Sequence, residues 1–156
     1  MKIKFIVVGK TEEQYLLDGI DKFEKRLQHY ATLENSVIPA LKNVEKLSIE
    51  QRKHKEGELI LNHITSSDVL ILLDEQGKQF TSVEFSEFLQ KRMNSGIKNL
   101  VFAVGGAYGF SDEIYKRANS KISFSKMTFS HQMIRLFFAE QLYRAFTILK
   151  QEPYHH

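Results

Sequence analysis

Cysteine is absent from this chain of 156 residues. Its absence excludes disulfide bonds, thiolate nucleophiles and zinc sites built on cysteine. Long hydrophobic runs are also missing, so no segment is predicted to span a membrane, and the apolar run near the N-terminus is too short for a signal peptide. We therefore expect a cytoplasmic protein that has no contact with membranes.

Acidic residues are missing from one part of the chain. No Asp or Glu lies between Ile114 and Ala139, although the whole chain has 19 acidic and 22 basic residues and a net charge of +3. The basic residues of this segment are Lys116, Arg117, Lys121, Lys126 and Arg135. The segment is either a solvated surface with an incidental charge bias or a surface that lies against phosphates.

The remaining sequence alternates between predicted strands and predicted helices. The strands are short apolar runs at residues 3–9, 36–40, 68–74, 99–106 and 121–125. Pro39 places the second of them at a sheet edge or a strand end, because proline lacks the N–H that a ladder needs. This alternation predicts a single α/β domain over residues 1–156, with a mostly parallel sheet and helices on both faces.

Capping boxes predict where three of the helices begin. In each box, the side chain of a Ser or Thr accepts a hydrogen bond from the backbone N–H three residues later. The Gln or Glu at that later position accepts one in return from the backbone N–H of the Ser or Thr. The pairs are Thr11 with Gln14, Ser48 with Gln51, and Thr81 with Glu84. The residues DEQGK, 74–78, are predicted to form a turn, and the last helix is predicted to run from Ser130–His131 to about Lys150.

Ligands of parallel α/β sheets bind beyond the carboxyl ends of the strands. Here those ends are predicted at Leu73–Gly77, Gly105–Gly109 and Phe124–Phe129. The second stretch, VGGAYG, allows a dinucleotide-binding interpretation, but Asp112 and Glu113 in the following helical turn would repel a pyrophosphate. The alternatives are a tight turn that needs glycine, or a close backbone approach by a neutral or cationic adenosine ligand.

The last helix carries apolar residues on more than one face. They are Met133, Ile134, Leu136, Phe137, Phe138, Leu142, Phe146 and Ile148. Such a helix must be buried nearly all round, either at the centre of a monomer or against a second chain, and we expect a homodimer. Glu140 and Arg144 are spaced for a helical salt bridge. His131, at the start of the helix, is either a structural residue or a catalytic base, and nothing beside it has metal-ligand spacing.

Several motifs together resemble one family across essentially the whole chain. They are VGK near the start, LDEQGK, VGGAYGF, SFSKMTFSHQMIRLFFAEQLYRAF and the terminal PYH. The chain is similar to the SPOUT-class ribosomal RNA large subunit methyltransferase H family, whose members methylate N3 of a pseudouridine in 23S rRNA. The resemblance implies a C-terminal trefoil knot and a homodimer with active sites at its interface.

The resemblance also implies which residues hold S-adenosylmethionine, the methyl donor. By motif, these are Leu73, Gly105, Phe124, Ser125, Lys126, Met127, Thr128 and Phe129. Ser130 stands where relatives often have proline. No metal is implied, because a sulfonium methyl group is transferred directly to nitrogen. His131, Tyr154 and His155 are candidates for the base or its orienting partner, and Arg135 for stabilising the imide anion.

The resemblance further implies that the RNA partner is 23S rRNA within the assembled ribosome. The terminal PYHH is then a native tail that reaches toward the partner's site; by itself it could equally be the remnant of a purification tag. Two other functions stay open: a related knotted methyltransferase acting on transfer RNA, and a non-catalytic factor that binds RNA or the ribosome. Donor binding without turnover on any RNA would favour the second.

Overall fold

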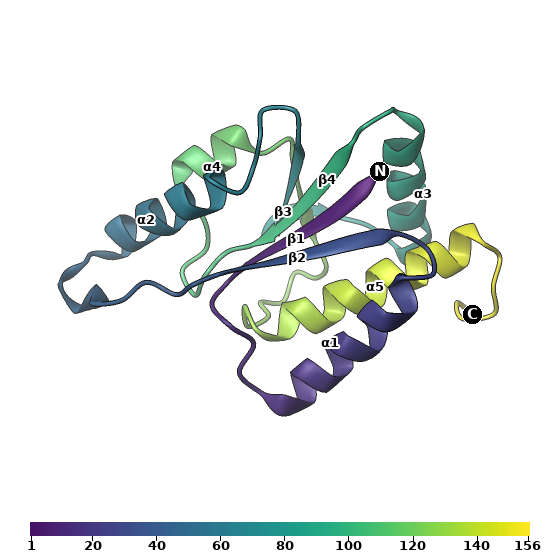
Figure 1. Ribbon diagram of the computed structural model, residues 1–156, viewed down its shortest axis with the longest axis horizontal. Coiled ribbons are helices and arrows are strands. Elements are labelled where there is room, and N and C mark those ends of the chain that lie inside the picture. Colours follow the sequence, from purple (N-terminus) through teal and green to yellow (C-terminus); the bar gives the residue numbers. More distant parts are fainter.

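The computed structural model describes all residues, 1–156, as one five-stranded sheet with helices on both faces (Figure 1). The strands are β1 (Lys2–Val8), β2 (Thr32–Ile38), β3 (Val69–Gln79), β4 (Asn99–Val104) and β5 (Ser120–Ser123). Every pair is parallel, and the spatial order is β2-β1-β4-β3-β5. The predicted α/β class and the parallel sheet are confirmed.

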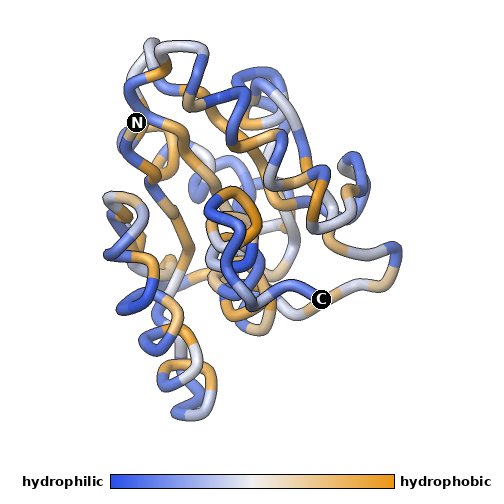
Figure 2. The backbone as a smooth tube through the Cα atoms, turned by 90° about the vertical axis from the view of Figure 1, so that its right-hand side faces the viewer, coloured by the Kyte–Doolittle hydropathy of each residue, from blue (hydrophilic) through white to orange (hydrophobic).

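Two helical layers cover the sheet. One face carries α1 (Gln14–Leu27), α3 (Ser82–Asn94) and α5 (Met133–Leu149), and the other carries α2 (Ile49–Leu61) and α4 (Asp112–Arg117) (Figure 1). A short 3₁₀ turn, η1 (Val44–Lys46), precedes α2. Hydrophobic and hydrophilic residues alternate along the helices in Figure 2, as expected for helices with one face on a sheet. No helix combines the length and the hydropathy that a membrane crossing needs.

Successive residues of the central strands point to opposite faces, so each face has its own apolar core. Phe5, Phe102 and Phe138 meet in the core beneath α5, where the ring centroids of Phe102 and Phe138 are 4.8 Å apart. On the other face, Ile60 of α2 and Ile114 of α4 pack on the alternate residues of the same strands. Both faces of the inner strands are therefore shielded from solvent, which explains their continuous apolar sequences.

The capping boxes at Ser48 and Thr81 are confirmed, but the one at Thr11 is wrong. Helix α1 begins at Gln14 after Glu13, with no side-chain cap. The Thr11 hydroxyl instead accepts a hydrogen bond from Nη1 of Arg135, at 3.1 Å. The Thr11 hydroxyl therefore bonds to a residue 124 positions away in the sequence, and not to the N–H of Gln14 as predicted.

The predicted turn at residues 74–78 is also wrong, because β3 continues to Gln79. Its pairing with β5 shifts register between Leu73 and Lys78, so the intervening residues form a bulge. Gly77 makes the bulge possible, since a Cβ there would lie 2.6 Å from the backbone of Ile122. The predicted strand near Pro39 is confirmed as an edge strand, β2, which ends at Ile38. The last helix begins at Met133, whose N–H is capped by Ser130 Oγ at 3.0 Å.

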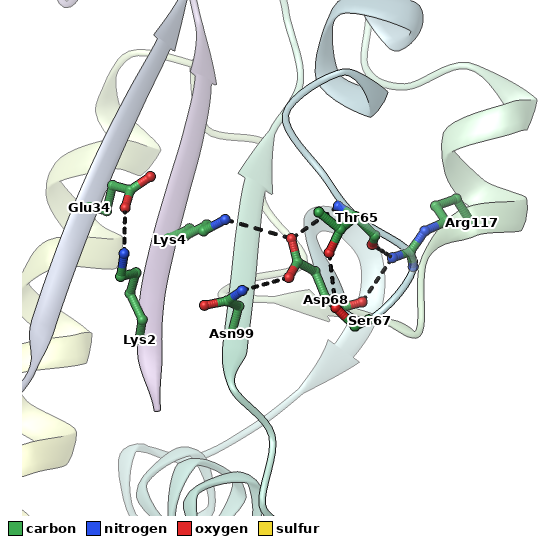
Figure 3. A network of polar contacts seen from close by, with 8 residues as sticks. All are labelled: Lys2, Lys4, Glu34, Thr65, Ser67, Asp68, Asn99 and Arg117. Carbon is green, nitrogen blue, oxygen red and sulfur yellow. Dashed lines mark hydrogen bonds and ion pairs between the residues drawn. The ribbon is translucent and has the colours of Figure 1, made fainter.

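A polar network closes the sheet at the amino ends of its strands (Figure 3). The Asp68 carboxylate accepts hydrogen bonds from Asn99 Nδ2 at 2.7 Å and from the Thr65 amide at 3.1 Å, and Lys4 Nζ lies 3.7 Å from it. Arg117 donates to the carbonyls of Thr65 and Asp68. This edge of the sheet is opposite the one at which ligands are expected, so the network stabilises the fold and is not part of the ligand site.

Candidate active site

The carboxyl ends of β4 and β5, and the point where the regular part of β3 ends in its bulge, meet at one cavity of about 650 Å³. Leu73 pairs with Val104 on one side and with Ile122 on the other, so the register brings the three predicted strand ends together. A volume of this size is typical of sites for small molecules and cofactors. The expectation that these three ends adjoin is confirmed, although it was drawn from sheet topology alone.

The turn that follows β4 supplies one wall of the cavity with little more than backbone. A Cβ on Gly105 would lie 3.0 Å from the carbonyl carbon and oxygen of Gly109, so any side chain there would press on the Gly109 backbone. Gly109 has a φ of 83° and donates its N–H to the Gly106 carbonyl at 3.1 Å. The chain then enters α4, where Ser111 caps the helix by accepting from the Ile114 N–H. The tight-turn and close-approach interpretations therefore both fit this segment.

A loop from Phe124 to Gln132 forms the opposite wall. Its first turn is held by the Ser123 hydroxyl, which donates to the Ser125 carbonyl at 2.7 Å, and by Ser125 Oγ, which accepts from the Met127 N–H at 2.9 Å. Among the predicted donor-binding residues of this loop, five line the cavity: Phe124, Ser125, Met127, Thr128 and Phe129. Lys126 is exposed and does not line it.

Two carboxylates in the bulge of β3 were missed as site residues. Asp74 and Glu75 line the cavity directly after Leu73. Asp74 accepts a hydrogen bond from the Tyr115 hydroxyl, and burial together with that bond raises the pKa of Tyr115. Thr128 donates to Glu75. Both lie within the predicted strand end Leu73–Gly77, but the family resemblance assigned only Leu73 of that stretch to the donor.

Tyr115 and Lys53 also line the cavity and were missed. They belong to α4 and α2, and no sequence spacing relates them to the strand ends. With the two carboxylates and a single lysine, the charged side chains of the lining favour a cationic ligand over a phosphate.

His131 is near the end of this loop and lines the cavity. Burial, aided by the nearby charge of Arg135, lowers the pKa of His131 below its ordinary value of 6.5. The imidazole is therefore neutral at neutral pH and has a nitrogen able to accept a proton.

Arg135 does not reach the cavity. Its side chain is fully buried and donates to the carbonyls of Val8 and Gly9, each at 2.8 Å, and of His131 at 3.0 Å. Burial lowers the pKa of this guanidinium. In this chain Arg135 therefore ties the start of α5 to the end of β1, and it touches the site only through the backbone of His131.

Tyr154 and His155 follow the carboxyl end of α5, fold back against Glu140 and Arg144 of that helix, and do not line the cavity. The Tyr154 hydroxyl donates to Glu140 Oε1 at 3.0 Å, and burial together with this bond raises the pKa of Tyr154. Glu140 also forms the predicted salt bridge with Arg144, at 2.6 Å. The four predicted catalytic residues are thus not brought together within one chain.

Much of the apolar surface of α5 is covered by its own chain, because α1 and α3 flank it on the sheet. Phe138 is buried against Phe5 and Phe102. What stays exposed is Phe137, whose ring lies 4.7 Å from that of Phe129, and Met127 on the neighbouring loop. The unpartnered apolar surface is therefore a small patch beside the cavity, smaller than the sequence indicated.

Fold and cavity together are those of a SPOUT methyltransferase: residues 1–155 match the family model described as "Predicted SPOUT methyltransferase". The chain is 61% identical to the ribosomal RNA large subunit methyltransferase H of Christiangramia forsetii, 60% to that of Flavobacterium johnsoniae and 62% to that of Flavobacterium psychrophilum. Each alignment covers 100% of this chain and 99% of the relative. The chain belongs to the ribosomal RNA large subunit methyltransferase H family and is a methyltransferase.

Proposed function

We propose that this chain uses S-adenosylmethionine to methylate N3 of a pseudouridine in 23S rRNA, acting in the cytoplasm on the assembled ribosome. The observation that carries the proposal is the cavity at the ends of β3, β4 and β5, which is lined by seven of the eight residues that the family resemblance implies for the donor. The names of the relatives support ribosomal RNA as the substrate class.

The residues of the cavity fit this donor. Gly105 and Gly106 line the cavity with backbone and no side chain, as a nucleoside lying against the turn requires. Asp74 and Glu75 offset the positive charge of a sulfonium. When bound, the donor supplies an activated methyl group. The side chains that would surround it are those of Leu73 and of the loop from Phe124 to Phe129.

The chain's own contribution to the chemistry is to hold the acceptor in line and to take up a proton. An imide N–H is a poor nucleophile until it is deprotonated. His131 lines the cavity and has a lowered pKa, so its neutral ring is the nearest candidate for the base. Arg135 would act through His131 by fixing the backbone that carries it. This replaces direct contact between Arg135 and the imide.

We further propose that the enzyme is a homodimer in which the C-terminal tail of each chain, with Tyr154 and His155, reaches the cavity of the other chain. Tyr154 and His155 are remote from the cavity of their own chain, so they can reach a cavity only on a second copy. The exposed Phe137 and Met127 lie beside the cavity, where such a partner would cover them. The C-terminal trefoil knot implied by the family stays a prediction.

RNA would be held by the basic residues near the cavity mouth. Lys126 is exposed on the loop and free of carboxylate partners, and Lys121 lies over the ring of Tyr115, 5.3 Å from its centroid. Arg117, in contrast, is engaged at the opposite edge of the sheet. Of the basic segment found in the sequence, we assign RNA contact to Lys121 and Lys126.

The test is to incubate the protein with methyl-labelled S-adenosylmethionine and, separately, with ribosomes, large subunits, small subunits and transfer RNA. The labelled nucleoside is then mapped by digestion and mass spectrometry, with EDTA present in a parallel set. We expect N3-methylpseudouridine in 23S rRNA, with and without EDTA. A label in transfer RNA would indicate the related knotted enzyme, and no label on any RNA would indicate a silent binding factor.

A further inference from the structure

Helix α2 touches the glycine turn of the cavity at several points, although it lies on the face of the sheet away from α5 (Figure 1). Lys53 lines the cavity directly. One turn later, the Glu56 side chain reaches Gly106. Next to it, Gly57 packs so closely on Ser111 that a Cβ there would lie 2.5 Å from the Ser111 hydroxyl. The segment from Gly105 to Ser111 therefore packs against α2.

The Glu56 carboxylate occupies the place that a side chain at position 106 would take. A Cβ on Gly106 would lie 2.6 Å from Oε2 and 2.8 Å from Oε1 of Glu56. Burial raises the pKa of Glu56, while a backbone hydrogen bond from Gly106 and the nearby charge of Arg52 lower it. The carboxylate is therefore partly withdrawn from water and directed at the turn.

The turn has few other constraints. Three of its five residues, from Gly105 to Gly109, are glycines, and its internal hydrogen bond is the one from the Gly109 N–H to the Gly106 carbonyl. Glycine has more backbone freedom to lose than any other residue. A turn of this composition holds one conformation only where its surroundings fix it. Glu56 is the carboxylate that lies against its backbone, and Arg52 lies over the Tyr108 ring, 5.8 Å from its centroid.

We propose that Glu56 is a positioning residue: it fixes the glycine turn in the conformation that receives the methyl donor. The inference rests on the proposed function, because it takes the cavity to be the donor site. Glu56 touches neither the donor nor the RNA in this role. Its effect reaches the donor through the backbone of Gly105 and Gly106.

The test compares Glu56→Ala and Glu56→Gln with Glu58→Ala, a control on the same helix whose exposed carboxylate pairs with His54 at 3.3 Å. Calorimetry with S-adenosylhomocysteine should give an affinity about tenfold weaker for Glu56→Ala, as expected when a hydrogen bond to a charged group is lost. Glu56→Gln keeps an acceptor oxygen and should stay within about threefold of wild type. Glu58→Ala should match wild type.

A double-mutant cycle separates positioning from a general loss of stability. Gly106→Ala should displace the carboxylate and weaken binding much as Glu56→Ala does, and the double variant should be no weaker than Glu56→Ala alone. In turnover, the donor KM should rise about tenfold with kcat within about twofold. The inference is overturned by wild-type affinity in Glu56→Ala, by additive losses in the cycle, or by equal losses in Glu56→Ala and Glu56→Gln. If the wild type itself binds no S-adenosylhomocysteine, the donor site and this inference both fail.

Discussion

The hydroxyl of Thr128 donates a hydrogen bond to Oε2 of Glu75 at 2.5 Å. This bond joins the loop that forms one wall of the cavity to the bulge of β3, which also lines it. Ser125 and Ser130 of the loop bond to residues beside them, and Gln132 at its end bonds to Lys10 and Glu12. Thr128 is therefore the side chain that ties the loop to β3.

Replacing Thr128 with valine removes this connection without changing the shape of the side chain. Both partners are exposed, so we expect a loss of about 0.5–1.5 kcal/mol, which corresponds to a two- to tenfold weaker donor affinity and appears mainly as faster release. Stopped-flow measurement of S-adenosylhomocysteine release checks this. Thr128→Ser keeps the hydroxyl and serves as the control, and equal release rates for the two variants would exclude the bond from donor retention.

The lowered pKa of His131 predicts an acid limb in the activity. Its neutral form accepts the proton, so kcat/KM should fall as pH drops below 6.5, the ordinary value, and through the lower pKa in the folded protein. His131→Gln should reduce kcat by about 10²–10⁴-fold and abolish this limb. His63→Gln, at an exposed histidine bonded to the Leu59 carbonyl, is the control. An unchanged limb in His131→Gln would mean that another group is the base.

Asp68 predicts a separate effect on stability. Burial raises its pKa, but the hydrogen bonds from Asn99 and Thr65 and the charge of Lys4 outweigh burial, and the net shift is downward. The folded state then binds this proton less readily than the unfolded state. Asp68 therefore contributes stability that is present above the unfolded pKa of about 3.9 and is lost as pH falls through the folded value.

Asp68→Ala should lower the free energy of unfolding at pH 7 by about 2–3 kcal/mol, because buried donors lose a charged acceptor. Urea titrations between pH 3 and pH 7 measure both the loss and its reduced pH dependence. Donor affinity should be unchanged, since the network lies at the opposite edge of the sheet from the cavity. Weakened donor binding in a folded Asp68→Ala protein would contradict the separation of the two edges.

The strand ends of the site were predictable because continuous apolar runs identify buried parallel strands, and such strands share one carboxyl edge. Leu73 and Gly105 were therefore placed correctly without any contact being known. The turn predicted at residues 74–78 failed because Gly77 marks a bulge, which a single sequence does not distinguish from a turn.

Contacts between distant residues account for the other differences. The predicted Thr11 cap does not form because the Thr11 hydroxyl accepts from Arg135. Phe138, one of the apolar residues that led us to expect a second chain, packs on a strand of its own chain. Lys53 and Glu56 belong to a charged stretch of α2 whose sequence resembles an ordinary solvated helix face. Only the fold brings these side chains to the glycine turn.

The placement of Tyr154 and His155 predicts complementation between subunits. A heterodimer that pairs a chain lacking residues 154–156 with a Gly105→Val chain has one intact cavity if the tail crosses over, and none if it does not. Isolated by two different affinity tags and assayed on ribosomes, it should retain about half of the wild-type activity. No activity, from a heterodimer shown by light scattering to be intact, would reject the crossed tail.

The central claim is that the cavity at the ends of β3, β4 and β5 holds the methyl donor, and Gly105→Val tests it most directly. A Cβ there would already lie 3.0 Å from the Gly109 carbonyl, so a branched side chain would displace the turn that forms one wall of the cavity. Thr32→Val is the control, because it places the same branched side chain at an exposed strand position of β2, which does not line the cavity. Calorimetry with S-adenosylhomocysteine in EDTA should show binding by the wild type and by Thr32→Val and none by Gly105→Val. Undiminished binding by a folded Gly105→Val protein would contradict the account.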